Sequence, residues 1–164
     1  MASTLFRLGA ALCLPLALAV SGCGMNVQTL QPYTPAQGVN QNVGQVMVRN
    51  LVVIADTTGR GVVSASLVSY ADDTLSAVAG VPQKSDGTAG SPLVVTTTGI
   101  PLTVTANTLF VLTLPPVRIS VTSPDLKPGL LAEVTLTFAK AGPLKAMAPV
   151  VSSEQPEYTG IRVG

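Results

Sequence analysis

The sequence contains no histidine and no tryptophan, and it has only two cysteines. Without histidine, the Ser-His-Asp and Cys-His arrangements that activate a nucleophile cannot form in their usual way. The Ser-x-x-Lys motif of serine enzymes is also missing, although composition alone leaves open a Ser-Lys pair built from distant residues. We therefore expect no catalytic residues, no cofactor and no enzyme activity.

Charged residues are scarce and balanced. Nine Lys and Arg residues stand against eight Asp and Glu residues in 164, and the basic residues do not cluster. Nucleic-acid binding needs clustered basic side chains to neutralise phosphates, and anionic lipids attract polybasic segments in the same way. The sequence therefore predicts no nucleic-acid partner and no electrostatic patch for membranes.

The first 22 residues have the pattern of a secretion signal. Arg7 provides the positive charge, and Leu8 to Val20 forms an apolar run interrupted only by Gly9 and Pro15. A run of about 13 residues is too short to span a bilayer as a stable helix. We expect residues 1–22 to direct export and then to be removed.

Ser21-Gly22-Cys23 follows this run and resembles the lipobox of bacterial lipoproteins, in which small residues precede an invariant cysteine. The resemblance implies a diacylglyceryl group on the Cys23 thiol and cleavage before Cys23, so that palmitate-type acyl chains anchor the chain. Two chains give stable membrane binding, whereas one binds only marginally. The alternative is an ordinary secretory signal that leaves Cys23 as a free thiol.

The other cysteine, Cys13, lies inside the apolar run and is lost with it, so one mature chain cannot form a disulfide. An unmodified thiol would be a liability in an oxidising compartment, and acylation of Cys23 removes that liability. The expected location is the extracytoplasmic face of the cell membrane, with the lipid on Cys23 as the membrane contact.

The mature chain divides by composition into three parts. Residues 23–45 are polar and punctuated by proline, which favours a lipidated N-terminus followed by a flexible tether, although Tyr33 and Val39 have the apolar surface to dock locally. Residues 46–151 are rich in Val, Thr and Leu, which favour strands, and in Gly and Pro, which favour turns. Residues 152–164 form a polar C-terminal tail.

Short apolar or alternating runs recur through residues 46–151, and none has helical spacing over the length that a helix needs. The second half of the first run is apolar on both faces, as in a strand buried on two sides. The pattern predicts an all-β, two-layer antiparallel Greek-key β-sandwich of the immunoglobulin or cupredoxin-like kind. The predicted strands are Val46–Ile54, Val63–Leu67, Leu75–Val81, Leu93–Val95, Leu102–Val104, Phe110–Leu112, Val117–Val121, Val134–Phe138 and Leu144–Val150.

Three polar features lie between these strands. Gln83 to Pro92 is rich in Gly and Ser and is predicted to be a flexible loop. Asp72-Asp73 is predicted to be a solvated turn, because adjacent strand residues point to opposite faces and so cannot share a cation. Arg118 is expected on a solvated face, with contact to an anion or a partner as the alternative.

Three motifs near the C-terminus resemble the end of the periplasmic copper chaperone family PCu(A)C: Leu126-Lys127-Pro128-Gly129, Val134-Thr135-Leu136-Thr137-Phe138 and Ala148-Pro149-Val150. The layout of tether and domain is also similar to that of small uncharacterised actinobacterial cell-envelope lipoproteins. The PCu(A)C resemblance implies a β-sandwich and a Cu(I) site made of histidine and methionine, which are ligands suited to that ion.

The family's His-x-Met falls near Pro116-Val117-Arg118, so no metal ligand carries over to this sequence. Met47 and Met147 are the weak sulfur candidates for a non-standard site, and methionine within an apolar strand more often fills a gap in the core. Met25 is a third sulfur, next to the predicted anchor.

Two hypotheses follow. The first is a non-catalytic, membrane-anchored lipoprotein of the cell envelope that binds a protein or envelope partner through loops at one end, such as Lys84 to Pro92. The second is a copper-chaperone-like carrier of a metal or small ligand with a non-standard site. The sequence does not identify the ligand or the binding residues.

Overall fold

A computed structural model describes residues 37–163, so the predicted signal, Cys23 and Met25 lie outside the described residues. The described part contains strands and one short 3-10 helix, which agrees with the prediction of an all-β chain. The elements are β1 (Val39–Val43), β2 (Val46–Ala55), β3 (Arg60–Ser69), β4 (Asp73–Pro82), β5 (Val94–Thr98), β6 (Leu102–Val104), β7 (Phe110–Val111), β8 (Arg118–Thr122), β9 (Leu131–Phe138), β10 (Gly142–Ser152) and η3 (Pro156–Tyr158).

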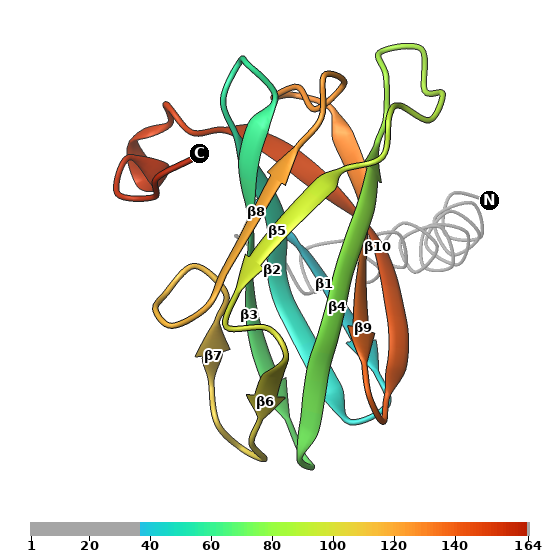
Figure 1. Ribbon diagram of the computed structural model, residues 1–164, viewed down its shortest axis with the longest axis vertical. Helices are drawn as coiled ribbons and strands as arrows, with labels where there is room; N and C mark the ends of the chain where they lie inside the picture. Colours follow the sequence, from blue (N-terminus) through green and yellow to red (C-terminus); the bar gives the residue numbers. More distant parts are fainter. Residues whose placement is uncertain (1–36, 164) are drawn as a thin grey trace, which may run out of the picture. The chain divides into compact units, whose positions relative to one another are not determined.

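The strands form one sheet that curls into two layers, in the order β5-β8-β3-β2-β10-β9-β4-β6, with β1 beside β2 and β7 beside β3 (Figure 1). One layer is built around β2, β3 and β8, and the other around β9 and β4. Strand β10 belongs to both, because its C-terminal part pairs with β2 and most of its length pairs with β9. The predicted β-sandwich is confirmed.

One strand pair departs from the antiparallel prediction. Val150 to Ser152 of β10 runs parallel to Val53 to Ala55 of β2, whereas every other strand pair among the described residues is antiparallel. Hydrophobic alternation along one strand determines which face is buried, but it carries no information about the direction of a neighbouring strand. This parallel contact joins the first and last long strands of the sandwich.

The core fills the space between the two layers and follows the alternation in the sequence. In β9, Val134, Leu136 and Phe138 are buried, and the residues between them are partly exposed. Their register partners in β10 include Ala146 and Leu144, which are buried as predicted. Each fully covered Val, Leu or Phe side chain contributes about 1.5 to 3 kcal/mol, so these two alternating strands supply much of the stability of their layer.

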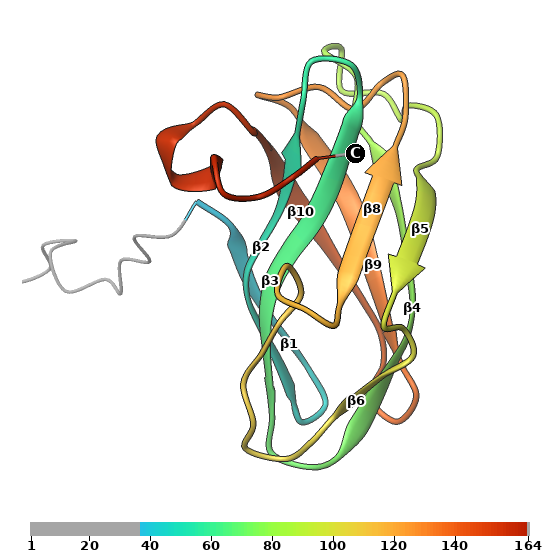
Figure 2. The same cartoon turned by 60° about the vertical axis from the view of Figure 1, so that its left-hand side comes forward.

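The apolar second half of β2 is buried on both faces, as predicted, and the C-terminal segment supplies the outer cover. Val52 and Ile54 form a second apolar cluster with Val62 and Val151, and Tyr158, Ile161 and Val163 pack against it. Figure 2 shows this segment curling over the outside of the sheet. The predicted polar tail is therefore partly apolar and folded onto the domain, because three spaced side chains suffice to cover this small cluster.

The ordered domain also begins earlier than Val46. Strand β1 lies in the last part of the predicted tether and pairs with β2, where Asn42 faces Met47 and Val43 faces Val46. The pairing passes an irregularity at Asn50, whose φ is 52° and whose side-chain oxygen accepts a hydrogen bond from the Gly38 N–H at 2.8 Å. For residues 39–43 the tether prediction was wrong. Asn and Gln are poor strand formers in isolation, and these residues form a strand because β2 provides a pairing partner.

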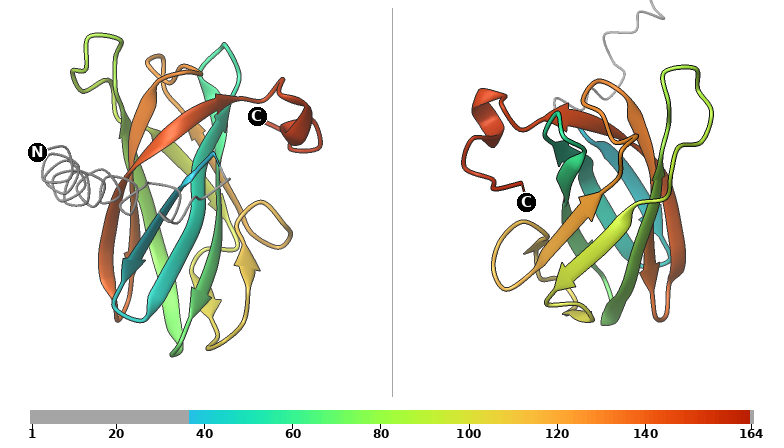
Figure 3. Two further views of the ribbon diagram at one scale, coloured as in Figure 1. Left: turned by 180° about the vertical axis from the view of Figure 1, so that it is seen from behind. Right: turned by 45° about the horizontal axis from the view of Figure 1, so that its top comes forward.

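Figure 3 shows the sandwich from behind and tilted so that its top comes forward. The connections after β2, β4 and β8 lie at one end, and the tight turns after β1, β3 and β9 lie at the other. Among the described residues, no helix has the length and apolar character needed to cross a membrane.

Candidate functional site: the loop end of the sandwich

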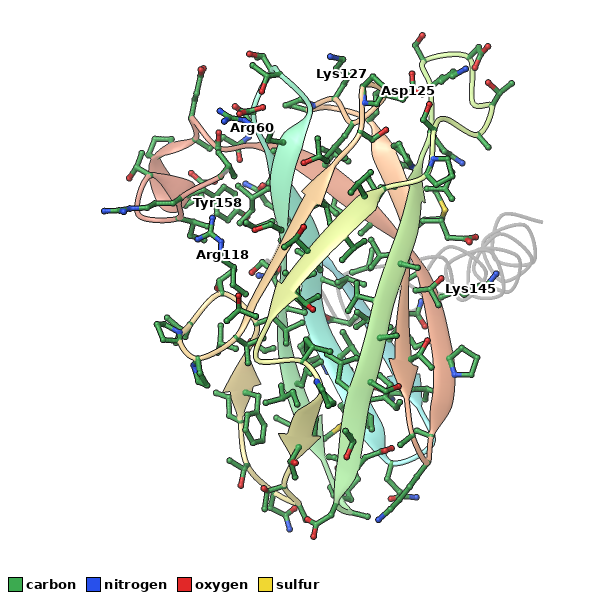
Figure 4. The ribbon with its side chains drawn as sticks, viewed as in Figure 1. Arg60, Arg118, Asp125, Lys127, Lys145 and Tyr158 are labelled. Carbon is green, nitrogen blue, oxygen red and sulfur yellow. The ribbon has the colours of Figure 1, made fainter. Side chains whose placement is uncertain are left out.

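The connections after β2, β4 and β8 gather at one end of the sandwich, and we call residues 56–59, 83–93 and 123–130 the loop end. Figure 4 labels Arg60, Asp125 and Lys127 there, together with Arg118 and Tyr158 on the side covered by the C-terminal segment. Lys127 Nζ donates to the carbonyl oxygen of Thr57 at 3.4 Å, so the first and third connections are in contact. The loop end is therefore one continuous surface.

Asp56 organises the connection after β2. Its carboxylate accepts hydrogen bonds from the N–H and hydroxyl of Thr58, and Arg60 donates from its backbone N–H and from its guanidinium Nε at 3.0 Å. Burial raises the pKa of Asp56, but the hydrogen bonds from Thr58 and Arg60 outweigh it and lower the pKa to about 2. Asp56 thus stays ionised and holds this turn closed.

The connection after β4 is closed by hydrogen bonds between its own residues, and we call residues 83–91 of this connection the excursion. Gln83 pairs with Ala89, Lys84 donates its N–H to the Thr88 carbonyl at 2.9 Å, and Asp86 accepts both the N–H and the hydroxyl of Thr88. The prediction of a loop is correct, but this loop has a hydrogen-bonded tip. Turn chemistry explains the difference, because Asp-Gly-Thr favours a closed turn.

The connection after β8 holds the base of the excursion in place through hydrogen bonds to Ser91. Asp125 accepts a hydrogen bond from the Ser91 N–H at 2.7 Å, and the buried Ser123 hydroxyl donates to the Ser91 carbonyl at 2.9 Å. The hydrogen bonds from Ser91 lower the pKa of Asp125. These residues were not predicted from the sequence, although Ser123-Pro124-Asp125 is a recognisable turn motif, because nothing local points to a partner 34 positions away in the chain.

An open depression of about 340 Å³ lies where the excursion leaves the sheet. Val81 and Pro82 line one side, Gly87 and Ala89 line the side of the excursion, and Met147 and Glu133 also line it. Lys145 Nζ lies 3.6 Å from a carboxylate oxygen of Glu133 on the same outer face of β9 and β10. The depression combines apolar walls with the Glu133 side chain, while Lys145 lies outside the lining, and this open form suits a partner side chain better than a buried cofactor.

The two methionine candidates lie on different parts of the molecule. Met147 is 36% exposed at the loop-end depression and faces Glu133 across the β9–β10 pair. Met47 is partly buried in β2, where its register partners are Asn42 of β1 and Val68 of β3. Neither is a core gap-filler, and none of the described cavities is lined by both.

The aspartate pair has separate structural roles at the opposite end. Asp73 is buried, not solvated as expected, and accepts N–H groups from Thr74, Lys140 and Ala141. Burial raises the pKa of Asp73, and these hydrogen bonds reverse the effect and lower it. Asp72 is exposed and accepts the Ala106 N–H at 2.7 Å. The prediction that the two carboxylates do not act together agrees with this arrangement.

At Pro116-Val117-Arg118, the segment to which the sequence resemblance assigns the His-x-Met of the copper chaperone family, the middle residue is buried and the other two are not. Val117 is buried, and the neighbouring cavity, lined by Leu112, Arg118 and Ile161 among others, has a volume of about 10 Å³. Arg118 donates to Ser120 Oγ and, through Nη2, to the Arg162 carbonyl at 2.7 Å, so it binds the C-terminal segment. Among residues 37–163, no three His, Cys, Asp or Glu side chains are grouped as a metal site would need.

Comparison with known proteins supports the fold. No protein-family profile and no curated protein matches the chain. Among solved structures, the copper-bound PCuAC domain from PmoF2 aligns with a TM-score of 0.52 at 18% identity, covering 70% of this chain and 98% of that chain. The apo PmoF2 PCuAC domain gives 0.49 at 17% identity, with 71% and 97% covered, and the apo PCuAC domain from PmoF1 gives 0.48 at 18%, with 70% and 99% covered. The described domain is therefore PCuAC-like in fold.

Proposed function

We propose that this chain is a non-catalytic, membrane-anchored lipoprotein of the cell envelope that binds a partner protein through its loop end. The anchor is the lipid expected on Cys23, the rigid part is the PCuAC-like sandwich, and the contact surface is the excursion at residues 83–91 with the depression beside it. The chain performs no chemistry on its partner in this proposal, since its sequence contains no histidine.

The observation that supports this surface most directly is the hydrogen-bonded excursion held by Asp125 and Ser123. Binding loops that are positioned by a rigid scaffold lose less conformational entropy when a partner docks. The adjoining depression offers Met147 as an adaptable apolar contact and Glu133 with Lys145 as a polar rim.

Site-directed photocrosslinking in intact cells tests the partner surface. A photoreactive residue replaces Ala89 or Met147 at the loop end, and a matched control replaces Ser76, which is exposed on β4 away from the loop end. We expect a defined cross-linked band from the loop-end positions that is lost when residues 84–88 are replaced by a two-residue turn. Equal cross-linking from Ser76, or bands unaffected by loop replacement, would reject this surface.

The anchor has its own test. Intact-mass analysis of the native protein should show a mature N-terminus at Cys23 carrying a diacylglyceryl group. Cys23→Ala should move the chain out of the membrane fraction, because the two acyl chains supply the membrane affinity. An unmodified Cys23 thiol in the native protein would remove the anchoring part of the proposal and leave the loop-end test unaffected.

The alternative is a copper-chaperone-like carrier, supported by the fold it shares with the copper-bound PCuAC domain. The residues present do not fit the histidine–methionine ligand set of that family, since histidine is absent and Met47 and Met147 lie on different strands. Cu(I) titration against a competing chelator tests the alternative directly. Binding at micromolar copper that is lost in both Met47→Leu and Met147→Leu would favour it over the partner-binding proposal.

A further inference from the structure

The C-terminal segment covers one half of the outer face of the layer built around β2 and β3, and it leaves the other half uncovered. Residues that are directly paired across two strands share a face of the sheet. The outer-face pairs of β2 and β3 are, from the loop end downward, Ile54 with Val62, Val52 with Ser64, Arg49 with Ser66 and Met47 with Val68. Ile54, Val52 and Val62 belong to the cluster that the C-terminal segment covers. Met47 and Val68 are on the same face, farther from the loop end and without that cover.

Other apolar side chains extend this uncovered half. Tyr70 is two residues beyond Val68 on the same face and is 64% exposed. Strand β7 pairs Ser66 with Val111 and Leu67 with Phe110, which places Leu109 next to Val68, and Leu109 is 62% exposed. Leu114, in the connection that follows β7, is 59% exposed, and its N–H donates to the carbonyl of Val111, which pairs with the outer-face residue Ser66. We call Met47, Val68, Tyr70, Leu109 and Leu114 the apolar patch.

Charge is absent from the chain segment that carries the two leucines of this patch, and the nearest charged residues in the chain are Arg49, two residues from Met47, and Asp72, two residues from Tyr70. From Gly87 to Val117 the sequence has no Asp, Glu, Lys or Arg, and this stretch includes Leu109 and Leu114. Above the patch, Arg49 Nη1 donates to Asn42 Oδ1 at 2.6 Å and forms a polar rim. An exposed group of large apolar side chains with a polar rim marks a surface that binds something apolar.

We propose that the apolar patch rests on the lipid bilayer, with Leu109, Leu114 and Tyr70 entering its interfacial region. The proposal rests on the anchored state argued above. Protruding leucines beside a tyrosine suit a fluid, apolar phase that needs no shape complementarity, and tyrosine favours the membrane interface. A protein partner would instead have to provide fitted pockets for side chains that are each more than half exposed.

The number of residues between Cys23 and the domain is consistent with the bilayer as the surface that the patch contacts. Residues 24–36 lie between Cys23 and the described domain, and 13 residues of any conformation span at most about 45 Å. Val39 begins β1, and Asn42, three residues or about 10 Å along that strand, faces Met47 of the patch. A lipid on Cys23 would therefore keep the patch within reach of the bilayer.

Fluorescence with lipid-borne quenchers tests the proposal on the mature lipidated chain in phosphatidylcholine vesicles. Thr108→Cys provides an exposed thiol next to Leu109 for an environment-sensitive dye. In the lipidated mature chain of the proposal, the Cys23 sulfur is acylated and Cys13 has been removed with the signal, so the dye reports on position 108. Thr88→Cys at the loop end is the matched control. We expect brominated acyl chains to quench the dye at position 108 and to leave the dye at position 88 unaffected.

The double variant Leu109→Asp with Leu114→Asp, in the Thr108→Cys background, should lose the quenching and keep its thermal midpoint, because both leucines are mostly exposed. Equal quenching at positions 88 and 108, none at either, or quenching that survives the double variant would overturn the proposal. Vesicle flotation and the mass of Cys23 report on the anchor separately. If Cys23 is unmodified, the soluble chain carrying Cys23→Ser is titrated with the same vesicles, so that the dye stays confined to position 108, and quenching there again decides.

Discussion

The carboxylate of Asp125 accepts a hydrogen bond from the backbone N–H of Ser91 at 2.7 Å, and this contact joins two connections that are 34 residues apart. It fixes the base of the excursion that we propose as the partner-binding surface. The Asp125 carboxylate shares this role with the Ser123 hydroxyl of the same β8–β9 connection, and its own part gives the first prediction.

Asp125→Ala should loosen the excursion without unfolding the sandwich, because the carboxylate lies at the loop end and outside the core. Amide hydrogen exchange should become faster at Ser91 and in the residues before it. Asp125→Asn is the matched control, since its amide oxygen can still accept the same hydrogen bond. Unchanged exchange in the alanine variant would show that the Ser123 hydroxyl alone holds the loop.

The stability of the domain should fall in acid because of Asp56. Its pKa is about 2 in the folded chain against an ordinary 3.8, so its contribution is present above about pH 4 and is lost as the pH falls through 2. The shift corresponds to roughly 2 kcal/mol as an upper bound, with the side chain 17% exposed. Urea unfolding of the wild type and Asp56→Asn between pH 2 and 5 checks this: the variant should have the shallower pH dependence, and identical slopes would contradict the assignment.

Tyr158→Ala should destabilise the outer cover of β2. The ring packs on the cluster that contains Val52 and Ile54, and its partial burial predicts a loss of about 1 to 3 kcal/mol in the free energy of unfolding. Tyr158→Phe should cost less than about 0.5 kcal/mol, because the hydroxyl makes only a long contact of 3.4 Å to Gln37. Equal losses in the two variants would place the stabilisation in the hydroxyl group.

Asn50→Ala should weaken the pairing of β1 with β2. Asn50 has a φ of 52° and accepts the Gly38 N–H, so alanine would lose the hydrogen bond and strain the backbone, at about 1 to 3 kcal/mol. Asn50→Gly should lower the stability less than Asn50→Ala does. Both variants lose the hydrogen bond, but glycine adopts this φ without strain. Chemical denaturation midpoints compare the two variants. A glycine variant less stable than the alanine variant would show that backbone strain at this position costs less than the freedom that glycine adds to the unfolded chain.

The alternation of Val134, Leu136 and Phe138, and of Leu144, Ala146 and Ala148, was enough to predict the buried faces of β9 and β10, because a strand has a period of two. The doubly apolar run of β2 likewise predicted burial on two sides. Sequence did not reveal that Tyr158, Ile161 and Val163 provide the second cover, or that Asn40 to Asn42 form a strand, because both depend on a partner distant in the chain.

By itself, the sequence determined the all-β class, the positions of strands β2 to β10 and the absence of histidine chemistry, since these depend on residue type and local periodicity. Tertiary structure alone decided that β10 runs parallel to β2, that Asp125 meets Ser91, and that Met47, Val68 and Leu109 share an uncovered face. Hydrophobic alternation and turn geometry can set the register of two strands joined by a turn. They do not specify which distant strand or loop becomes the neighbour, nor which part of an outer face stays uncovered, because both depend on how the whole chain packs.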